Sequence, residues 1–387
     1  MSTFSQRLPP HADTNAISAA IAAAAAGGTL VDLTESNPTR AGFDYPPDLL
    51  AGLGSEAGLV YEPLPLGLLE AREAIAADAA RRGVSIDPAH VVLSASSSES
   101  YGWLFKLLCN PGDGVLVPRP SYPLFEHLTR LEAVRVIPYD LEYHGRWQID
   151  FASIASAPPD TRAVLVVTPN NPTGSYLDSA ELGRLVSICR DRDWALIADE
   201  VFADYALETT SPLTDVAARA DVLSFSLGGA SKALGLPQVK LGWMVAGGPA
   251  APRDAALAAL ELIADTYLSV GTPVQQAAPE LLRRGAAVRE QILGRITQNL
   301  ARARTLVSAH PSCELLRVEG GWSAVVRVPA TRSEEDLVLE LLRRERILVH
   351  PGFFFDFRHE AFVVVSLLPQ PDIFGAALDR VLRFAVT

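Results

Sequence analysis

Short apolar segments alternate with segments of helical periodicity through the first 270 residues. Four of these segments, at 91–93, 163–167, 195–198 and 222–225, are short and mostly apolar, and each lies between candidate helices or loops. Nearly continuous apolar strands are typical of a sheet that is buried on both faces, and helices between strands are typical of parallel connections. The pattern therefore predicts an α/β fold with a mostly parallel sheet covered by helices.

Beyond residue 273 the pattern changes to longer helical segments and alternating strands. A helical region covers roughly 274–309, and a last helix starts near residue 372. Further helices are predicted at 16–26, 68–82, around 124–130, 177–192 and 333–345, and one runs up to residue 108; further strands are predicted at 29–33, 115–117, 134–138, 322–328, 347–349 and 362–367. We predict a large domain at 45–272 and a smaller α+β domain at 273–387. Residues 1–44 are expected to form an N-terminal arm and a segment that joins the small domain.

Composition and charge exclude several classes of partner. The 387 residues are 49% hydrophobic and 20% charged, which is typical of a folded globular protein. The net charge of −12 argues against nucleic acid or an anionic membrane as the main partner. The seven histidines show no metal-ligand spacing, and three widely spaced cysteines indicate neither a disulfide framework nor a zinc site. A cytoplasmic location is therefore expected, with no metal.

The alanine-rich segment 16–26 is the part of the chain most similar to a targeting signal. Asp13 precedes it where a signal peptide would carry a basic residue, so we interpret it as a short helix. No segment approaches the roughly 20 apolar residues that a membrane-spanning helix needs.

Polar residues follow four of the predicted strands. Ser94–Ser100 follows the first, Asn170 and Asn171 follow the second, Asp199 closes the third, and Lys232 follows the fourth. Ligands of parallel α/β sheets bind beyond the carboxyl ends of the strands. These residues are therefore predicted to form one site.

Lys232 and Asp199 are the two reactive groups of this set. Lys232 lies in a loop of Ser, Gly and Ala residues, where partial burial would lower its pKa and let it attack an aldehyde. A surface lysine in a flexible turn explains this loop equally well. Asp199 needs a partner because an unpaired buried carboxylate is costly. A protonated ring nitrogen, a helix N-terminus or a salt bridge would each supply one.

Two further features, a serine turn and a tyrosine, are candidates for holding a ligand. Ser96, Ser97 and Ser98 lie where a strand turns into a helix, and a helix N-terminus with hydroxyl groups can bind a phosphate. An ordinary serine N-cap is the alternative. Tyr122 could stack on a planar ring or could simply belong to the core.

Taken together, these motifs resemble those of class I/II aminotransferases, which are fold-type-I pyridoxal-phosphate enzymes. The resemblance extends from about residue 32 to the C-terminus, and the motifs follow the order of that family. They are Tyr61 with Gly67 and 71–76, the turn at Ser96–Ser98, 110–113, 120–122, 171–174, Asp199-Glu200 and Ser231-Lys232.

The resemblance implies a role for each residue at the ring of pyridoxal 5′-phosphate. Lys232 would form the aldimine with the cofactor and then move a proton between the substrate α-carbon and C4′. Asp199 would keep the pyridine nitrogen protonated, so that the ring accepts electrons. Asn171 would hydrogen-bond the 3-oxygen, and Tyr122 would stack on the ring.

The resemblance also implies how the phosphate is held. Ser96, Ser97 and Ser98 would bind it together with Lys240. Tyr61 would reach it from the partner subunit, which implies a homodimer with shared active sites.

Three positions depart from the family pattern. Phe202 replaces a tyrosine that donates to the 3-oxygen, and its loss should raise the pKa of the aldimine. Lys240 replaces an arginine, which keeps the charge and loses the bidentate geometry. Val364 replaces the arginine that binds the substrate carboxylate. Arg40 and Arg358 are candidates for that task, and neither is assigned to it.

The sequence therefore predicts an aminotransferase that exchanges an amino group between an amino acid and a 2-oxo acid in a ping-pong reaction. Phe202 and Val364 leave open a different pyridoxal-phosphate reaction on the same fold, such as C–S lyase (β-eliminase), decarboxylase or specialised biosynthetic chemistry. A regulatory protein that binds the cofactor without catalysis would need a DNA-binding module. The sequence shows neither a basic N-terminal extension nor a helix-turn-helix candidate.

Overall fold

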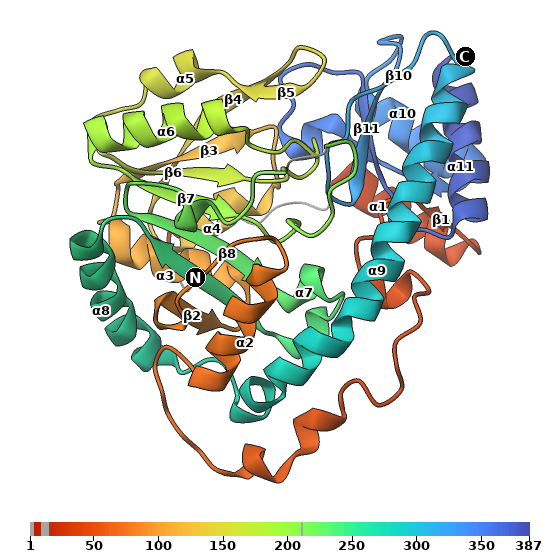
Figure 1. Ribbon diagram of the computed structural model, residues 1–387. Helices are drawn as coiled ribbons and strands as arrows, with labels where there is room; N and C mark the ends of the chain where they lie inside the picture. Colours follow the sequence, from red (N-terminus) through yellow and green to blue (C-terminus); the bar gives the residue numbers. More distant parts are fainter. Residues whose placement is uncertain (1–3, 9–14, 210–211) are drawn as a thin grey trace.

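The computed structural model describes residues 4–8, 15–209 and 212–387, and a mixed eight-stranded sheet lies at its centre (Figure 1). The strand order is β2-β9-β8-β7-β6-β3-β4-β5, in which β9 and β5 run antiparallel to their neighbours. The predicted α/β fold with a mostly parallel sheet is confirmed. The strands are β2 (Val91–Ser94), β3 (Gly114–Arg119), β4 (Arg135–Tyr143), β5 (Trp147–Ile149), β6 (Thr161–Val167), β7 (Ala195–Asp199), β8 (Ser224–Gly229) and β9 (Gly242–Gly247).

Helices cover both faces of this sheet, with α5 and α6 on one side and α3 and α8 on the other (Figure 1). Leu165 of β6 packs in one cluster with Trp103 and Leu260, and its neighbour Val164 packs in another with Leu185. Alternate residues of a strand therefore meet different helices, which explains why the central strands are apolar throughout. The helices are α2 (Leu69–Ala80), α3 (Ser97–Leu108), α4 (Leu124–Leu131), α5 (Phe151–Ala155), α6 (Ser179–Arg192), α7 (Ala230–Ala233) and α8 (Ala250–Tyr267).

Helix α8 is the long helix that the sequence pattern did not identify. It is rich in alanine and buries only Ala256, Leu260 and Ala264, so its apolar face is narrow. Helix α6 shows the opposite case, because Asp178 and Glu181 form a capping box that marks its start in the sequence.

The C-terminal part forms a four-stranded antiparallel sheet with helices against it, as the α+β pattern predicted. The strand order is β10-β11-β14-β13. The predicted helix at 333–345 continues as a π-helical turn, Leu341–Glu345, and ends at Arg346. The elements are α9 (Thr272–Ser308), β10 (Glu314–Leu315), β11 (Ser323–Arg327), α10 (Glu334–Glu340), β12 (Ile347–Leu348), β13 (His350–Pro351), β14 (Phe362–Ser366) and α11 (Pro371–Ala385).

The N-terminal segment packs against this C-terminal part. Helix α1 (Ala16–Ala26) contacts α10, and β1 (Val31–Asp32) pairs in parallel with β12. The guanidinium of Arg346 donates to the carbonyl oxygens of Ala24, Gly28 and Thr29, and so satisfies the last turn of α1. The predicted domain boundaries remain predictions. Of the predicted arm at 1–14, residues 1–3 and 9–14 lie outside the described part of the chain.

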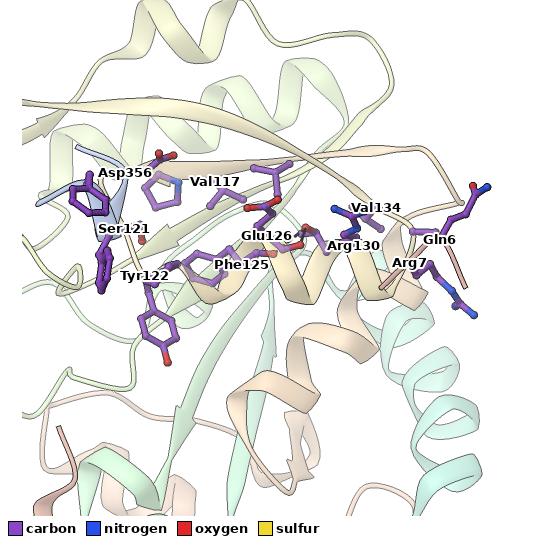
Figure 2. Close-up of a pocket in the computed structure, with 17 residues that line it drawn as sticks. Gln6, Arg7, Val117, Ser121, Tyr122, Phe125, Glu126, Arg130, Val134 and Asp356 are labelled. Atoms are coloured by element: carbon purple, nitrogen blue, oxygen red, sulfur yellow. Dashed lines mark hydrogen bonds between the residues drawn. The ribbon is translucent and has the colours of Figure 1, made fainter. Parts of the chain in front are cut away.

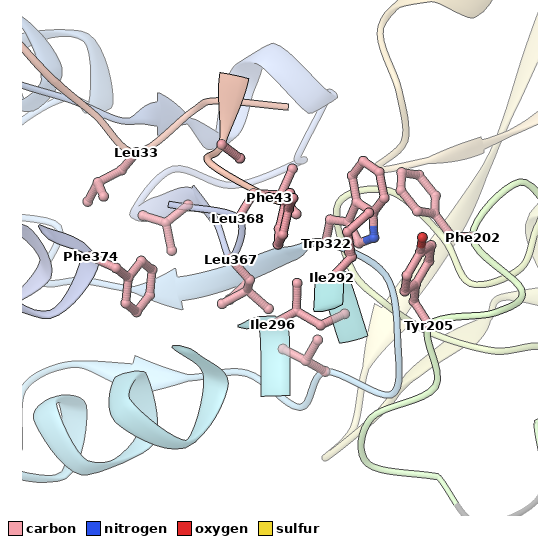
Figure 3. Packing of buried hydrophobic residues seen from close by; sticks show 14 of the residues in the cluster. Leu33, Phe43, Phe202, Tyr205, Ile292, Ile296, Trp322, Leu367, Leu368 and Phe374 are labelled. Atoms are coloured by element: carbon pink, nitrogen blue, oxygen red, sulfur yellow. The ribbon is translucent and has the colours of Figure 1, made fainter. Parts of the chain in front are cut away.

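One hydrophobic cluster connects the two parts of the molecule. Helix α9 contacts α2 near one end and α11 near the other. Figure 3 shows Trp322 beside Phe202 and Tyr205, with Ile292 of α9 and Leu367 on the other side. The cluster therefore reaches from the small antiparallel sheet to the loop that follows β7.

Among the described residues, no single helix has the length and apolar composition of a membrane span. Helices α8 and α9 meet those criteria only as a pair, with a bend of 120° between them.

Candidate active site

The register of the parallel strands brings the predicted site residues to one edge of the sheet. Val167 of β6 lies opposite Asp199 of β7, and Asp199 lies opposite Leu227 of β8. Because the three strands end at nearly the same level, Asn171, Asp199 and Lys232 all lie beyond this edge. The structure therefore brings together the residues that the strand ends predicted.

Lys232 lies in the short helix α7 directly after β8, and two aromatic rings flank its amino group. Nζ is 4.9 Å from the ring centre of Trp322 and 5.5 Å from that of Phe202. Burial lowers the pKa of Lys232 from its ordinary value near 10.5 to about 8, while the charge of Asp199 opposes this shift. The hydroxyl of Tyr205 donates to the Lys232 carbonyl oxygen at 2.6 Å. Lys232 is thus an enclosed amine on a fixed backbone, and the alternative of a flexible surface turn does not fit.

Asp199 ends β7 as a buried carboxylate. It accepts hydrogen bonds from the Tyr101 hydroxyl at 2.7 Å and from the Val201 amide at 3.1 Å. Burial raises the pKa of Asp199, and these two donors and the charge of Lys232 act in the opposite direction. No described Lys, Arg or His side chain makes a salt bridge with Asp199. Asp199 therefore has no salt bridge among the described residues, which leaves its carboxylate able to accept a ring N–H.

The turn before α3 has the form of an anion site. Ser96 caps the helix, and its hydroxyl accepts from the Glu99 amide at 3.2 Å. The amides of Ser97 and Ser98 have no acceptor within the described part of the chain. A Cβ on Gly242 would lie 2.8 Å from the carbonyl carbon of Ser96, so β9 packs closely beneath the turn. The N-cap alternative is therefore true of Ser96, and Ser97 and Ser98 are free to bind a phosphate.

Lys240 lies at the same end of the sheet as this turn. It precedes Gly242, which pairs with Ser94 at the end of β2, and its backbone is left-handed with φ 57°. Its side chain is exposed. It is one of only three lysines in the chain, with Lys106 and Lys232. The structure thus places a solvated cation close to the serine turn.

The loops of Asn171 and Tyr122 are tied to each other. The Asn170 side chain donates to the Pro120 carbonyl oxygen at 3.0 Å and accepts from the Ser121 hydroxyl at 3.2 Å. Asn171 is partly exposed and makes no side-chain hydrogen bond among the described residues. Partial burial and the charge of Asp199 raise the pKa of Tyr122, although 45% of that residue is exposed. Both side chains are therefore available to a ligand above Asp199.

A cavity of about 720 Å³ lies beside this group rather than around it (Figure 2). It follows α4 from Tyr122 to Arg130 and ends near Arg7. Figure 2 shows the Tyr122 ring pointing away from the other lining side chains. Lys232 and Asp199 do not line it. The cavity therefore adjoins the outer side of the candidate site.

Tyr61 lies largely exposed on the surface of the subunit. It is 71% exposed and follows Leu59 and Val60, which are 85% and 66% exposed. The segment that carries them extends away from the body of the molecule (Figure 1). Within one subunit, the residues around Lys232 thus do not cover the Tyr61 side chain.

The structure also shows what surrounds two of the departures from the family pattern. Phe202 packs edge-on against Trp322 at 5.2 Å and faces the Lys232 amino group. Val364 is 1% exposed in β14, opposite Val325 on one side and His350 on the other. Burial lowers the pKa of His350, with the charge of Asp32 acting against this. No hydroxyl and no guanidinium therefore occupies either position.

The two candidate arginines differ in their surroundings. Arg358 makes a salt bridge with Asp140 at 2.5 Å, and Asp140 also binds Arg119. Arg40 is exposed at the end of the 3-10 helix Pro38–Arg40 and makes no ion pair within the described ranges. Only Arg40 has a guanidinium that is free for a carboxylate.

Three residues of the site were not predicted from the sequence: Tyr101, Tyr205 and Trp322. A signal existed for Tyr101, because a tyrosine one turn into a buried helix needs a partner for its hydroxyl. Tyr205 and Trp322 act through tertiary contacts that no local pattern reveals. No group of three or more His, Cys, Asp or Glu side chains in the described residues could hold a metal ion.

A buried lysine, an unpaired carboxylate and a serine turn at one sheet edge agree with the family that the motifs indicated. The sequence profile described as "Aminotransferase class I and II" matches residues 60–372, which is most of the chain. This chain is a class I and II aminotransferase. The aminotransferase is 28% identical over 92% of its length to the glutamate-pyruvate aminotransferase AlaA of Haemophilus influenzae, and covers 91% of that protein.

Two further comparisons agree with this assignment. The aminotransferase is 27% identical over 94% of its length to the alanine aminotransferase of Mycobacterium bovis, and covers 87% of that protein. The solved structure of the alanine aminotransferase from Pyrococcus furiosus superimposes with a TM-score of 0.85 at 25% identity, covering 96% of this chain and 97% of that one.

Proposed function

We propose that this aminotransferase uses pyridoxal 5′-phosphate, held by Lys232, Asp199 and the serine turn. The observation that supports this most directly is the enclosed Lys232 amine, whose pKa is lowered to about 8 beside a buried carboxylate that has no cationic partner. When bound, the cofactor supplies an aldehyde for the lysine and a ring that accepts electrons. With its pKa lowered to about 8, Lys232 has a larger neutral fraction near pH 7 than an ordinary lysine, so it can accept and return a proton.

The remaining residues position the cofactor in this proposal. The free amides of Ser97 and Ser98, the Ser96 turn and the Lys240 charge bind the phosphate. Tyr122 stacks on the ring, and Asn171 donates to the 3-oxygen. Asp199 accepts the ring N–H, which gives its carboxylate a charged hydrogen-bond partner in place of the salt bridge that it lacks.

We further propose that the enzyme is a homodimer with shared active sites. The exposed apolar segment of Leu59, Val60 and Tyr61 supports this, since side chains of this kind usually pack against another chain. A neighbouring cavity of about 130 Å³ is lined by Tyr61, Trp103 and Gln275. In the dimer, Tyr61 of each subunit reaches the phosphate that the other subunit holds. We propose a cytoplasmic location, because all three cysteines are free thiols.

The proposed reaction is a ping-pong exchange between a small amino acid, such as alanine or glutamate, and a 2-oxo acid. The names of the relatives at 27–28% identity support this substrate class. The test is a panel of amino donors, each offered with pyruvate and with 2-oxoglutarate, in which product amino acids are measured.

Alanine or glutamate is expected to rank first in this panel, and Lys232→Ala is expected to abolish the exchange. A wild-type protein that gains no visible absorbance with pyridoxal phosphate would contradict the cofactor assignment. A donor that yields pyruvate and ammonia without any 2-oxo acid acceptor would instead show elimination chemistry at the same site.

A further inference from the structure

Tyr101 is a buried tyrosine whose hydroxyl lies against the candidate active site. It is 2% exposed, in the first turns of α3, directly after the serine turn. Its ring packs edge-on against Phe125 at 5.3 Å and stacks on Phe105 at 6.0 Å. Because these contacts fix the ring, the direction of its O–H bond is limited. That bond points to Oδ2 of Asp199 at 2.7 Å.

The hydrogen bonds of Asp199 divide between its two oxygens. Tyr101 donates to Oδ2, and the Val201 amide donates to Oδ1 at 3.1 Å. The Val201 amide lies only two residues further along the chain than Asp199, so it cannot fix the plane of the carboxylate by itself. Tyr101 comes from another element, and two anchors on different elements define one orientation of the carboxylate.

The hydrogen bond also favours the charged form of Asp199. Burial raises the pKa of this carboxyl, and the Tyr101 hydroxyl is the first of the groups that lower it again. Burial and the Asp199 charge raise the pKa of Tyr101 well above 10, so its phenol stays protonated and donates. Because the Tyr101 phenol stays protonated and donates, the Asp199 carboxylate remains the acceptor of this hydrogen bond.

We propose that Tyr101 is a positioning residue that holds the Asp199 carboxylate as an oriented anion for the ring N–H of the bound cofactor. This inference rests on the proposed function, in which Asp199 meets the pyridine nitrogen. It adds a residue of α3 to the machinery, so the helix whose start binds the phosphate also controls the opposite end of the ring.

The test compares two cofactors on the apoenzyme. One is pyridoxal phosphate, and the other is its analogue with C–H in place of the ring nitrogen, which cannot donate to Asp199. Dissociation constants are measured by absorbance for the wild type, Tyr101→Phe and Tyr139→Phe. Tyr139 is a matched control, since it is a buried tyrosine whose hydroxyl donates to the Leu165 carbonyl oxygen at 3.0 Å, away from Asp199.

Tyr101→Phe is expected to weaken the binding of pyridoxal phosphate about tenfold, as loss of a hydrogen bond to a charged group would. It should leave the binding of the analogue nearly unchanged. Tyr139→Phe should change the dissociation constants of the two compounds by the same factor or not at all. Equal weakening of both compounds by Tyr101→Phe, or no weakening, would overturn the inference. A wild type that binds neither compound would overturn the proposed function instead.

A second variant covers the case in which Tyr101→Phe does not fold. Incorporation of 3-fluorotyrosine at position 101 makes the hydroxyl a stronger donor with little change in shape. This substitution is expected to tighten the binding of pyridoxal phosphate relative to that of the analogue. An unchanged ratio of the two dissociation constants would overturn the inference.

Discussion

The hydroxyl of Ser366 donates to the carbonyl oxygen of Glu35 at 2.6 Å, which joins the end of β14 to the loop that carries Arg40. Ser366 is two residues beyond Val364, the position at which the family pattern has an arginine. Arg40 therefore lies in a loop that is joined to the end of the strand from which the arginine is missing. We therefore expect substitutions of Arg40 and of Arg358 to have different effects on substrate binding.

Arg40→Ala is expected to raise KM for the amino acid and the 2-oxo acid by roughly 10- to 100-fold, as the loss of a charged hydrogen bond would. Arg358→Ala is the control, because its guanidinium already binds Asp140. Steady-state kinetics of both variants decide the point. If Arg40→Ala leaves KM at the wild-type value, the carboxylate is bound elsewhere.

Lys232 of the apoenzyme should react with formaldehyde and cyanoborohydride in a pH-dependent way, with half-maximal reaction near pH 8. The sign follows from its pKa of about 8: below that pH the amine is protonated and unreactive, and above it the amine is neutral. Mass spectrometry of the methylated peptides measures the profile, which is simple because the chain has three lysines.

The same lysine in the urea-unfolded chain is the control. There it should titrate at the ordinary lysine value of about 10.4. Identical profiles in the folded and unfolded chains would show that burial does not lower its pKa.

Phe202→Tyr should restore a hydroxyl donor beside the cofactor 3-oxygen. Such a donor stabilises the oxygen when it is anionic, so the pH at which the absorbance of the bound cofactor changes should fall by about one unit. A spectroscopic titration of wild type and variant measures the shift. Phe202→Leu removes the ring without adding a donor, and it should not lower this pH. An unchanged transition in Phe202→Tyr would mean that the hydroxyl does not reach the oxygen.

Shared active sites predict complementation between two defective proteins. Lys232→Ala and Tyr61→Ala change residues that would meet across the subunit boundary, so one of the two sites in a hybrid dimer is intact. Refolding an equal mixture should therefore recover about a quarter of the wild-type activity. Lys232→Ala mixed with Asp199→Asn is the control, because both residues belong to one subunit's site and no intact site can form. Equal activity in the two mixtures would argue against sharing.

The sequence predicted the central strands well and indicated which polar residues follow them, for a local reason. Leu165 and Ile197 belong to runs of apolar residues; Asp199 follows its run directly, and Asn171 comes four residues after Val167. Parallel strands with matched ends then bring these residues together without further information. Strand identity and strand ends are therefore enough to predict that Asn171, Asp199 and Lys232 lie at one edge of the sheet.

The surroundings of the site could not be predicted in this way. Trp322 approaches Lys232 from the residue before β11, 90 positions later in the chain, and Tyr101 reaches Asp199 from α3. The orientation of an aromatic ring depends on tertiary packing, which leaves no periodic pattern in the sequence. Val364 shows a related limit. The sequence reveals that an arginine is missing at this position, but it does not reveal which residues surround Val364.

The contact of Trp322 with Lys232 gives the enzyme an internal optical probe. Trp322 directly precedes β11 of the small antiparallel sheet, whereas Phe202, Tyr205 and Lys232 lie in segments that follow strands of the large sheet. Any rotation of one sheet against the other changes the distance from the indole to a nearby amine, which quenches its fluorescence when the two are close. The chain has five tryptophans, so in a variant that keeps only Trp322 the emission would report any such rotation in real time, without an added label.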